Sequence, residues 1–377
     1  MTLILPRPEV DADGLLEYSV VYTDRALNHM SHKFRHALAA VSSALKSLYR
    51  ADYCAAVPGS GTSGMEAVAR QLARGQKCLI VRNGLFSFRW TQILEQGKLA
   101  AETRVCAARP VHNGANAPFA PAPIDEVCAQ IADFRPALVF APHVETASGM
   151  MLPDDYIRRL ADAAHAVGAL LVIDAIASGC MWLDMRGSGI DILLSAPQKG
   201  LSAPPCCGLV LLNETAYQRV QHTDSDSFAL DLKKWLAIMA AFENGAHAYH
   251  ATPPTDALYR LHLALEEAAH TGFDTLKARQ AELGARVRAL LAQHGFDSVA
   301  AAGFEAPGVV VAYTGGRADL HNGSAFAAHG VQIAAGVPLQ CGENANFQTF
   351  RIGLFGLDKL HDVDAAYNRF AAALTQL

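Results

Sequence analysis

The amino-acid sequence predicts an α/β protein with a parallel sheet, followed by a smaller α+β part. Two observations predict this arrangement. In the first two thirds of the 377 residues, wholly apolar runs of strand length alternate with helical patterns, which is typical of a parallel sheet covered on both faces. Beyond about residue 272, long helical patterns enclose strands such as Gly308–Tyr313. A chain of this length is large enough for two domains.

Six apolar strands are expected in the first part, and helical patterns separate several of them. The expected strands are Tyr53–Val57, Cys78–Val81, Ala137–Ala141, Ala169–Ile173, Ile190–Leu194 and Gly208–Leu212. The expected helices of the whole chain include Met65–Leu72, Asp154–Val167, Leu258–His270, Leu276–His294 and Val363–Leu377. Gly272 interrupts the helical pattern. We therefore expect an N-terminal segment 1–20, a large domain 21–272 and a small C-terminal domain 273–377.

Composition excludes several classes of protein. The net charge is −5 and no block of like charge occurs, which argues against nucleic-acid and anionic-membrane surfaces. No apolar run reaches the roughly 18 residues of a membrane span, and the N-terminus lacks the pattern of a secretory signal. The eight cysteines have no zinc-like spacing. A reduced cytoplasmic protein with free thiols is therefore expected.

A glycine-rich loop follows the first expected strand. It has the sequence Pro58-Gly59-Ser60-Gly61-Thr62-Ser63-Gly64 and leads directly into a helix. Free N–H groups and the positive end of the helix dipole favour a phosphate there. An ordinary strand-to-helix turn is the alternative interpretation of this loop alone.

An acid and a lysine follow two later strands. Asp174 terminates an apolar strand, and Lys199 lies 25 residues further on, within Ser195–Gly200. One strand–helix–strand step would bring both to the carboxyl edge of the sheet, where ligands bind. Taken singly, Asp174 would be a helix cap or half of a buried ion pair, and Lys199 a surface lysine. A phosphate loop, a partner for a pyridinium nitrogen and a Schiff-base amine together predict pyridoxal 5'-phosphate as cofactor.

Six segments carry a resemblance to a known family, from about residue 50 to the C-terminus. They are PGSGTSGMEA, RNGLFSFRW, HVETASGM, VIDAIASG, SAPQKGLSAPP and FRIGLFG. The chain resembles the class V aminotransferases of fold type I, and among them the alanine–glyoxylate and serine–pyruvate aminotransferases. The resemblance implies a seven-stranded, mostly parallel sheet in a large cofactor-binding domain. A further segment, SFALDLKKWL followed by AYHATPP, resembles the part that reaches into the partner's site, which implies a homodimer.

The resemblance also implies a role for individual residues. Lys199 would be the Schiff-base lysine and the proton-transfer base, with Asp174 on the pyridine nitrogen. Phe86 would stack on the ring and Thr146 would lie near its hydroxyl. The phosphate would be held by Ser60, Gly61, Thr62 and Gln198, and from the partner subunit by Tyr249 and Thr252. Arg351 would bind the substrate carboxylate through a planar two-point contact. His143 and Glu145 receive no role.

These residues predict transamination from a small amino acid, alanine or serine, to glyoxylate or pyruvate. A cysteine desulfurase or β-lyase using Cys341 is one alternative, although Gln198 and Phe86 stand where desulfurases carry histidines. A 2-aminoethylphosphonate aminotransferase is another, with Arg82 and Arg89 as extra cations beside Phe86. A noncatalytic regulator would be expected to lack the lysine or the acid, and a dehydrogenase is disfavoured because the loop lacks the GxGxxG context.

No metal site is predicted. His29, His32 and His36 lie close together in the sequence, but no acid or cysteine completes a ligand set, so a polar helix face is favoured.

Overall fold

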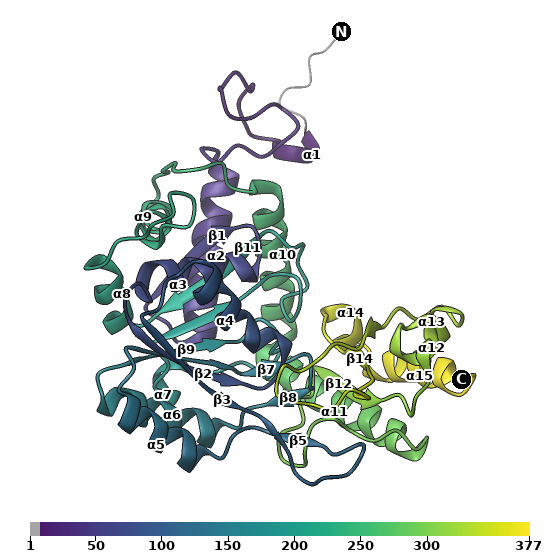
Figure 1. Ribbon diagram of the computed structural model, residues 1–377. Helices are drawn as coiled ribbons and strands as arrows, with labels where there is room; N and C mark the ends of the chain where they lie inside the picture. Colours follow the sequence, from purple (N-terminus) through teal and green to yellow (C-terminus); the bar gives the residue numbers. More distant parts are fainter. Residues whose placement is uncertain (1–7) are drawn as a thin grey trace.

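The computed structural model describes residues 8–377 and contains two main sheets flanked by helices (Figure 1). The strands are β1 Tyr53–Pro58, β2 Lys77–Arg82, β3 Glu102–Ala107, β4 Arg109–Pro110, β5 Phe119–Ala120, β6 Leu138–Pro142, β7 Val144–Glu145, β8 Met150–Met151, β9 Leu170–Asp174, β10 Ile192–Ser195, β11 Cys207–Leu212, β12 Val309–Tyr313, β13 Ala334–Ala335 and β14 Thr349–Gly353. The helices are α1 Pro8–Asp11, α2 His32–Tyr49, α3 Gly61–Leu72, α4 Leu85–Gln96, α5 Ile124–Phe134, α6 Asp154–Ala166, α7 Met185–Ser188, α8 Glu214–Gln221, α9 Leu232–Glu243, α10 Thr255–Thr271, α11 Phe273–Gln293, α12 Ala318–His321, α13 Ser324–Ala327, α14 Leu357–Leu360 and α15 Val363–Leu374.

The larger sheet has seven strands in the order β1-β11-β10-β9-β6-β2-β3. The pairs from β10 to β3 are all parallel, whereas β11 runs antiparallel to both β1 and β10. The predicted α/β fold with a mostly parallel, seven-stranded sheet is therefore confirmed. All six expected strands of this part are present, each within two residues of its expected bounds.

The direction of β11 is the one departure from the expected parallel pattern. Only the loop 196–206, which contains no helix, joins β10 to β11. A parallel return needs a crossover of about a dozen residues or more, usually a helix. This short connection therefore returns the chain antiparallel. The apolar sequence of β11 carries no sign of this, because a fully buried strand looks the same in either direction.

Helices cover both faces of the larger sheet. Every residue of β6, β9, β10 and β11 is buried, as expected for strands with helices on each side. On one face, Trp90 of α4 stacks on Phe140 of β6 and Gly64 of α3 lies against Leu194 of β10, while α5 and α6 lie on the other side of the sheet (Figure 1). The covered sheet is rigid, so the residues at its strand ends are held in fixed positions.

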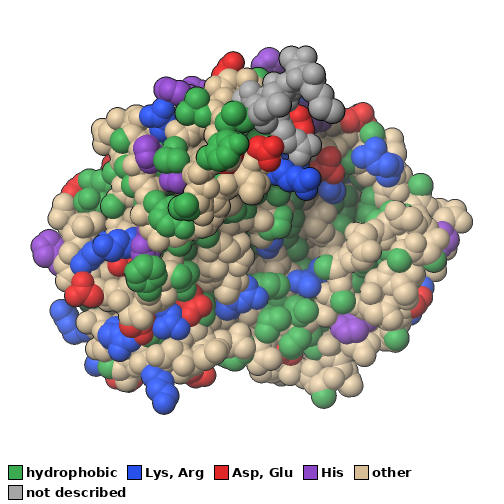
Figure 2. All heavy atoms as spheres, turned by 90° about the horizontal axis from the view of Figure 1, so that it is seen from above, with side chains coloured by type: hydrophobic (Ala, Val, Ile, Leu, Met, Phe, Trp, Pro, Cys, Tyr) green, Lys and Arg blue, Asp and Glu red, His purple; other side chains and the backbone are tan. Residues whose placement is uncertain are grey.

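The C-terminal part has its own antiparallel sheet, in the order β12-β14-β13. Its core includes Leu283, Phe326 and Phe350, packed between α11, α13 and β14. Gly272 separates α10 from α11 with a φ of +92°, a backbone conformation that favours glycine. We propose the boundary between the large and small domains at this residue. Figure 2 shows the surface hollowed between the two parts, with basic and hydrophobic side chains along the hollow.

The N-terminal segment projects from the main body (Figure 1). Of the expected segment 1–20, residues 1–7 lie outside the described part. Leu15, Tyr18 and Val20 are largely exposed apolar side chains within it. Across residues 8–377, no helix combines the length and apolar character needed to cross a membrane.

Candidate active site

Three chain turns meet at the carboxyl edge of the larger sheet. β9 ends at Asp174, which lies opposite Leu194 of β10 in the parallel register. The N–H of Ala175 donates to the Leu194 carbonyl at 2.8 Å. Lys199 lies in the turn after β10, and the loop after β1 begins at the same edge. The predicted strand–helix–strand step is therefore present, with α7 as its short helix.

The glycine-rich loop turns sharply from β1 into α3. Gly59 has a φ of +122°, and a Cβ there would lie 2.3 Å from Ser63 Oγ, so only glycine fits. The N–H of Ser60 donates to Ser63 Oγ at 3.2 Å. The helix begins at Gly61, four residues earlier than the apolar pattern predicted. The N–H groups of Ser63 and Gly64 donate to the Ser60 carbonyl. Those of Gly61 and Thr62, at the very start of the helix, lack an intrahelical partner and offer a site for an anion.

Asp174 is a buried carboxylate, with 7% of its surface exposed. Oδ1 accepts a hydrogen bond from the N–H of Ile176 at 2.9 Å. Burial raises the pKa of Asp174 to about 6, while this hydrogen bond and the charge of Lys199 act in the opposite direction. A carboxylate in this environment is stabilised by a cationic partner.

Lys199 extends between two aromatic rings. Its Nζ lies 5.8 Å from the centroid of Phe86 and 5.7 Å from that of Phe355. Burial lowers the pKa of this amine, and Asp174 and Glu145 partly offset the change. The turn is fixed by Gly200, where a Cβ would lie 2.1 Å from the Gly179 carbonyl oxygen. A desolvated amine of this kind is suited to nucleophilic attack on a carbonyl.

Phe86 lies in the first turn of α4, and Glu145 holds that turn in place. The fully buried Glu145 carboxylate accepts from the N–H groups of Phe86 (3.2 Å), Ser87 (2.8 Å) and Ala147 (3.0 Å), and from Ser87 Oγ (2.7 Å). A Cβ on Gly84 would lie 2.7 Å from Glu145 Cγ. The sequence assigned no role to Glu145, although Gly84 and Glu145 lie in two of the matching segments, RNGLFSFRW and HVETASGM.

Three cationic side chains converge on the Phe86 ring. Beside Lys199, the Cζ of Arg89 lies 5.2 Å and the Cζ of Arg351 5.6 Å from its centroid. Arg351 is on β14, where its Nε donates to the Ala335 carbonyl at 2.7 Å. Within residues 8–377, none of the three forms an ion pair with a carboxylate. The site is therefore built to receive anions.

Of the remaining predicted residues, Thr146 is buried, whereas Gln198, Tyr249 and Thr252 are exposed. Thr146 directly follows Glu145, and its buried Oγ1 has no hydrogen-bond partner in the described part of the chain. Gln198 precedes Lys199 and is exposed. Tyr249 and Thr252 are also exposed and bond to each other at 2.8 Å, and within residues 8–377 no hydrogen bond, ion pair or ring contact joins them to Lys199 or to the Ser60 loop.

Two side chains considered in the alternative interpretations are engaged elsewhere. Burial raises the pKa of the Cys341 thiol to about 12, so little of it is thiolate at neutral pH. The Arg82 guanidinium lies over Phe88 and donates to the Gln340 carbonyl at 3.1 Å.

Burial lowers the pKa of His143 to about 3, so this side chain is neutral, and it bonds Ser178 Oγ at 2.7 Å.

The three N-terminal histidines do not converge. The ring of His36 faces His262, His32 contacts Arg35, and His29 packs against Tyr22. Among residues 8–377, no group of three or more His, Cys, Asp or Glu side chains is arranged to bind a metal ion.

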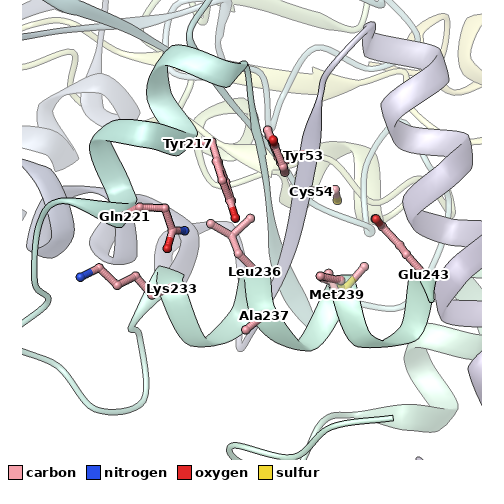
Figure 3. A pocket seen from close by; sticks show the side chains of 10 residues that line it. Tyr53, Cys54, Tyr217, Gln221, Lys233, Leu236, Ala237, Met239 and Glu243 are labelled. Carbon is pink, nitrogen blue, oxygen red and sulfur yellow. The ribbon is translucent and has the colours of Figure 1, made fainter. Parts of the chain in front are cut away.

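A cavity of about 130 Å³ lies at the opposite end of β1 from the glycine-rich loop (Figure 3). Tyr53 and Tyr217 stack on one wall with centroids 3.8 Å apart, and Lys233 and Glu243 of α9 line other parts of it. None of the predicted site residues lines this cavity, so it is separate from the site at the strand ends.

Comparison with known proteins gives concordant results. The family model described as aminotransferase class V matches residues 12–365. A 2-aminoethylphosphonate–pyruvate transaminase of Paraburkholderia phymatum is 30% identical over 322 residues, covering 84% of this chain and 82% of the relative. An alanine–glyoxylate aminotransferase of Callithrix jacchus is 32% identical over 233 residues, covering 61% and 53%. The crystal structure of an alanine–glyoxylate aminotransferase from Nostoc sp. superposes with a TM-score of 0.78 at 20% identity, covering 93% and 88%, which concerns the fold alone.

Proposed function

The chain belongs to the class V aminotransferases, and from that premise we propose that it transfers an amino group from alanine or serine to glyoxylate or pyruvate, at the site around Lys199. It is a transaminase that uses pyridoxal phosphate. The placement of the site rests on one observation. Lys199, Arg89 and Arg351 converge on the Phe86 ring, and none of them has an acidic partner in residues 8–377.

The side chains present fit this cofactor. The partly desolvated carboxylate of Asp174 suits a protonated pyridine nitrogen. The partnerless Thr146 Oγ1 suits the ring hydroxyl. The loop at Ser60, Gly61 and Thr62 suits the phosphate, and the exposed Gln198, just before Lys199, would also bind it. Phe86 provides an aromatic face for the ring.

Each residue then has a physical task. When bound, pyridoxal phosphate withdraws electrons from the substrate α-carbon and so makes its proton acidic. Arg351 binds the substrate carboxylate and orients the α-carbon towards Lys199. The lowered pKa of Lys199 keeps part of its amine neutral, which lets Nζ take the α-proton and return it. Asp174 holds the proton on the ring nitrogen through its charge.

We further propose that the enzyme is a homodimer of the cytoplasm. Tyr249 and Thr252 are exposed and bond to each other, so they would be available to complete the phosphate site of a partner subunit. A twofold interface presents the same surface from both subunits, and twofold dimers are the commonest homo-oligomers. The free cysteines, most of them buried, suit a reducing compartment.

A panel of amino donors tests the substrate assignment. The purified enzyme would receive alanine, serine, aspartate or 2-aminoethylphosphonate, each with glyoxylate or pyruvate, while the absorbance of the bound cofactor is followed. 2-Aminoethylphosphonate is included because a relative covering 84% of this chain carries that activity in its name. We expect alanine or serine to react fastest. Faster turnover with the phosphonate would overturn the donor assignment, and sulfide release from cysteine without an acceptor would overturn transamination.

A further inference from the structure

Arg89 connects the aromatic face of the site with the phosphate loop. It lies on α4, with its guanidinium carbon 5.2 Å from the Phe86 centroid. Its Nη1 donates to Thr62 Oγ1 at 2.9 Å, and Thr62 belongs to the first turn of α3. One guanidinium therefore contacts both the ring expected to carry the cofactor and the loop expected to hold its phosphate.

The charge of Arg89 is not neutralised within the described chain. No carboxylate of residues 8–377 lies within ion-pair distance of it, and Thr62 Oγ1 accepts the one side-chain hydrogen bond it makes. A guanidinium has five N–H donors. By contrast, Arg70 on α3 pairs with both Glu66 and Asp226. Arg89 therefore keeps donors and charge available for an anionic ligand.

The phosphate loop by itself offers only neutral donors. Ser60, Gly61 and Thr62 supply hydroxyl and backbone N–H groups, whereas a phosphate carries between one and two negative charges near neutral pH. The other two cations of the site have other tasks, because Lys199 holds the cofactor carbonyl and Arg351 the substrate carboxylate. On the basis of the proposed function, we propose that Arg89 is a further cofactor-binding residue whose guanidinium pairs with the phosphate.

Arg82 offers a matched control seven residues earlier in the sequence. It is also half-buried and also stacks on an aromatic ring, with its Cζ 4.7 Å from the Phe88 centroid. However, its donors go to the Gln340 carbonyl and to Thr91 Oγ1, and it makes no contact with the Ser60 loop. Replacing Arg82 therefore perturbs the same helix region without removing charge from the phosphate site.

The test compares three probes on the full-length protein after removal of its cofactor. Dissociation constants would be measured for pyridoxal phosphate and for pyridoxal, which lacks the phosphate, together with the inhibition constant of inorganic phosphate against pyridoxal phosphate. In Arg89→Gln we expect about 10- to 100-fold weaker binding of pyridoxal phosphate, as for loss of a charged hydrogen bond. Binding of inorganic phosphate should weaken in parallel, and pyridoxal should bind as in the wild type.

The variants separate a charge effect from a structural one. Arg82→Gln should leave all three constants unchanged, and Arg89→Lys should recover part of the phosphate affinity because it keeps the charge. Unchanged pyridoxal binding in Arg89→Gln would itself report an intact fold. Equal losses for pyridoxal and pyridoxal phosphate would overturn the proposal, because Arg89 would then act only through Phe86. Wild-type protein that binds no pyridoxal phosphate would instead overturn the proposed function on which this inference rests.

Discussion

Replacing Asp174 with Asn should stabilise the cofactor-free protein while it abolishes activity. Burial raises the pKa of Asp174 from 3.8 to about 6. The folded protein therefore holds this proton more tightly than the unfolded chain, so stability falls as the pH rises from about 4 to 6 and stays lower above pH 6. A shift of about two pKa units corresponds to about 3 kcal/mol. The neutral amide of Asn avoids this cost.

The assay is urea denaturation of the cofactor-free protein at several pH values. At pH 8 we expect the free energy of unfolding of Asp174→Asn to exceed that of the wild type by up to about 3 kcal/mol, and at pH 5 by roughly half as much. Asp191 is the matched control, because this buried acid accepts hydrogen bonds from the N–H of Leu171, from Asn213 Nδ2 and from His165 Nε2. Asp191→Asn should destabilise the protein. An Asp174→Asn variant no more stable than the wild type at pH 8 would refute the reasoning.

Three further substitutions test individual contacts. Arg351→Lys should raise KM for the amino donor by about 10- to 100-fold, since the planar two-point contact is lost; an unchanged KM in steady-state kinetics would remove Arg351 from the substrate site. Cys341→Ser should leave transamination within about twofold of wild type, because a thiol with a pKa near 12 is not a nucleophile at neutral pH; loss of turnover in the same assay would revive the thiol-based alternative. Gly200→Ala should lower both the melting temperature and cofactor retention, because the new Cβ would lie 2.1 Å from a carbonyl oxygen; wild-type values in both measurements would contradict the packing described for Lys199.

The sequence predicted the larger sheet well because its strands are continuous apolar runs. It also located the edge at which Asp174 and Lys199 meet, since an acid and a lysine at the ends of neighbouring parallel strands leave few alternatives. The less apolar β3, at the sheet edge, was not predicted, because its half-exposed residues lack the continuous pattern. The antiparallel direction of β11 was not predictable from the apolar pattern, since direction depends on a connection whose conformation the pattern does not describe.

Within the site, the sequence indicated residue types but not their contacts. Glu145 received no role because three of its four hydrogen bonds reach from β7 to α4, over 58 or 59 residues of the chain. Arg82 and Arg89 were equivalent in the sequence. The fold distinguishes them, because only Arg89 contacts the first turn of α3.

Reduction of the loaded enzyme with borohydride, followed by peptide mass spectrometry, tests the central role of Lys199 most directly. Borohydride makes the link between an amine and the cofactor carbonyl permanent, so the labelled lysine can be identified. We predict that the cofactor's mass is found on the peptide containing Lys199, and that Lys199→Ala shows neither this label nor turnover. Lys233→Ala, at an ion-paired lysine of α9, should retain both. A label on another lysine, or undiminished turnover in Lys199→Ala, would contradict the account.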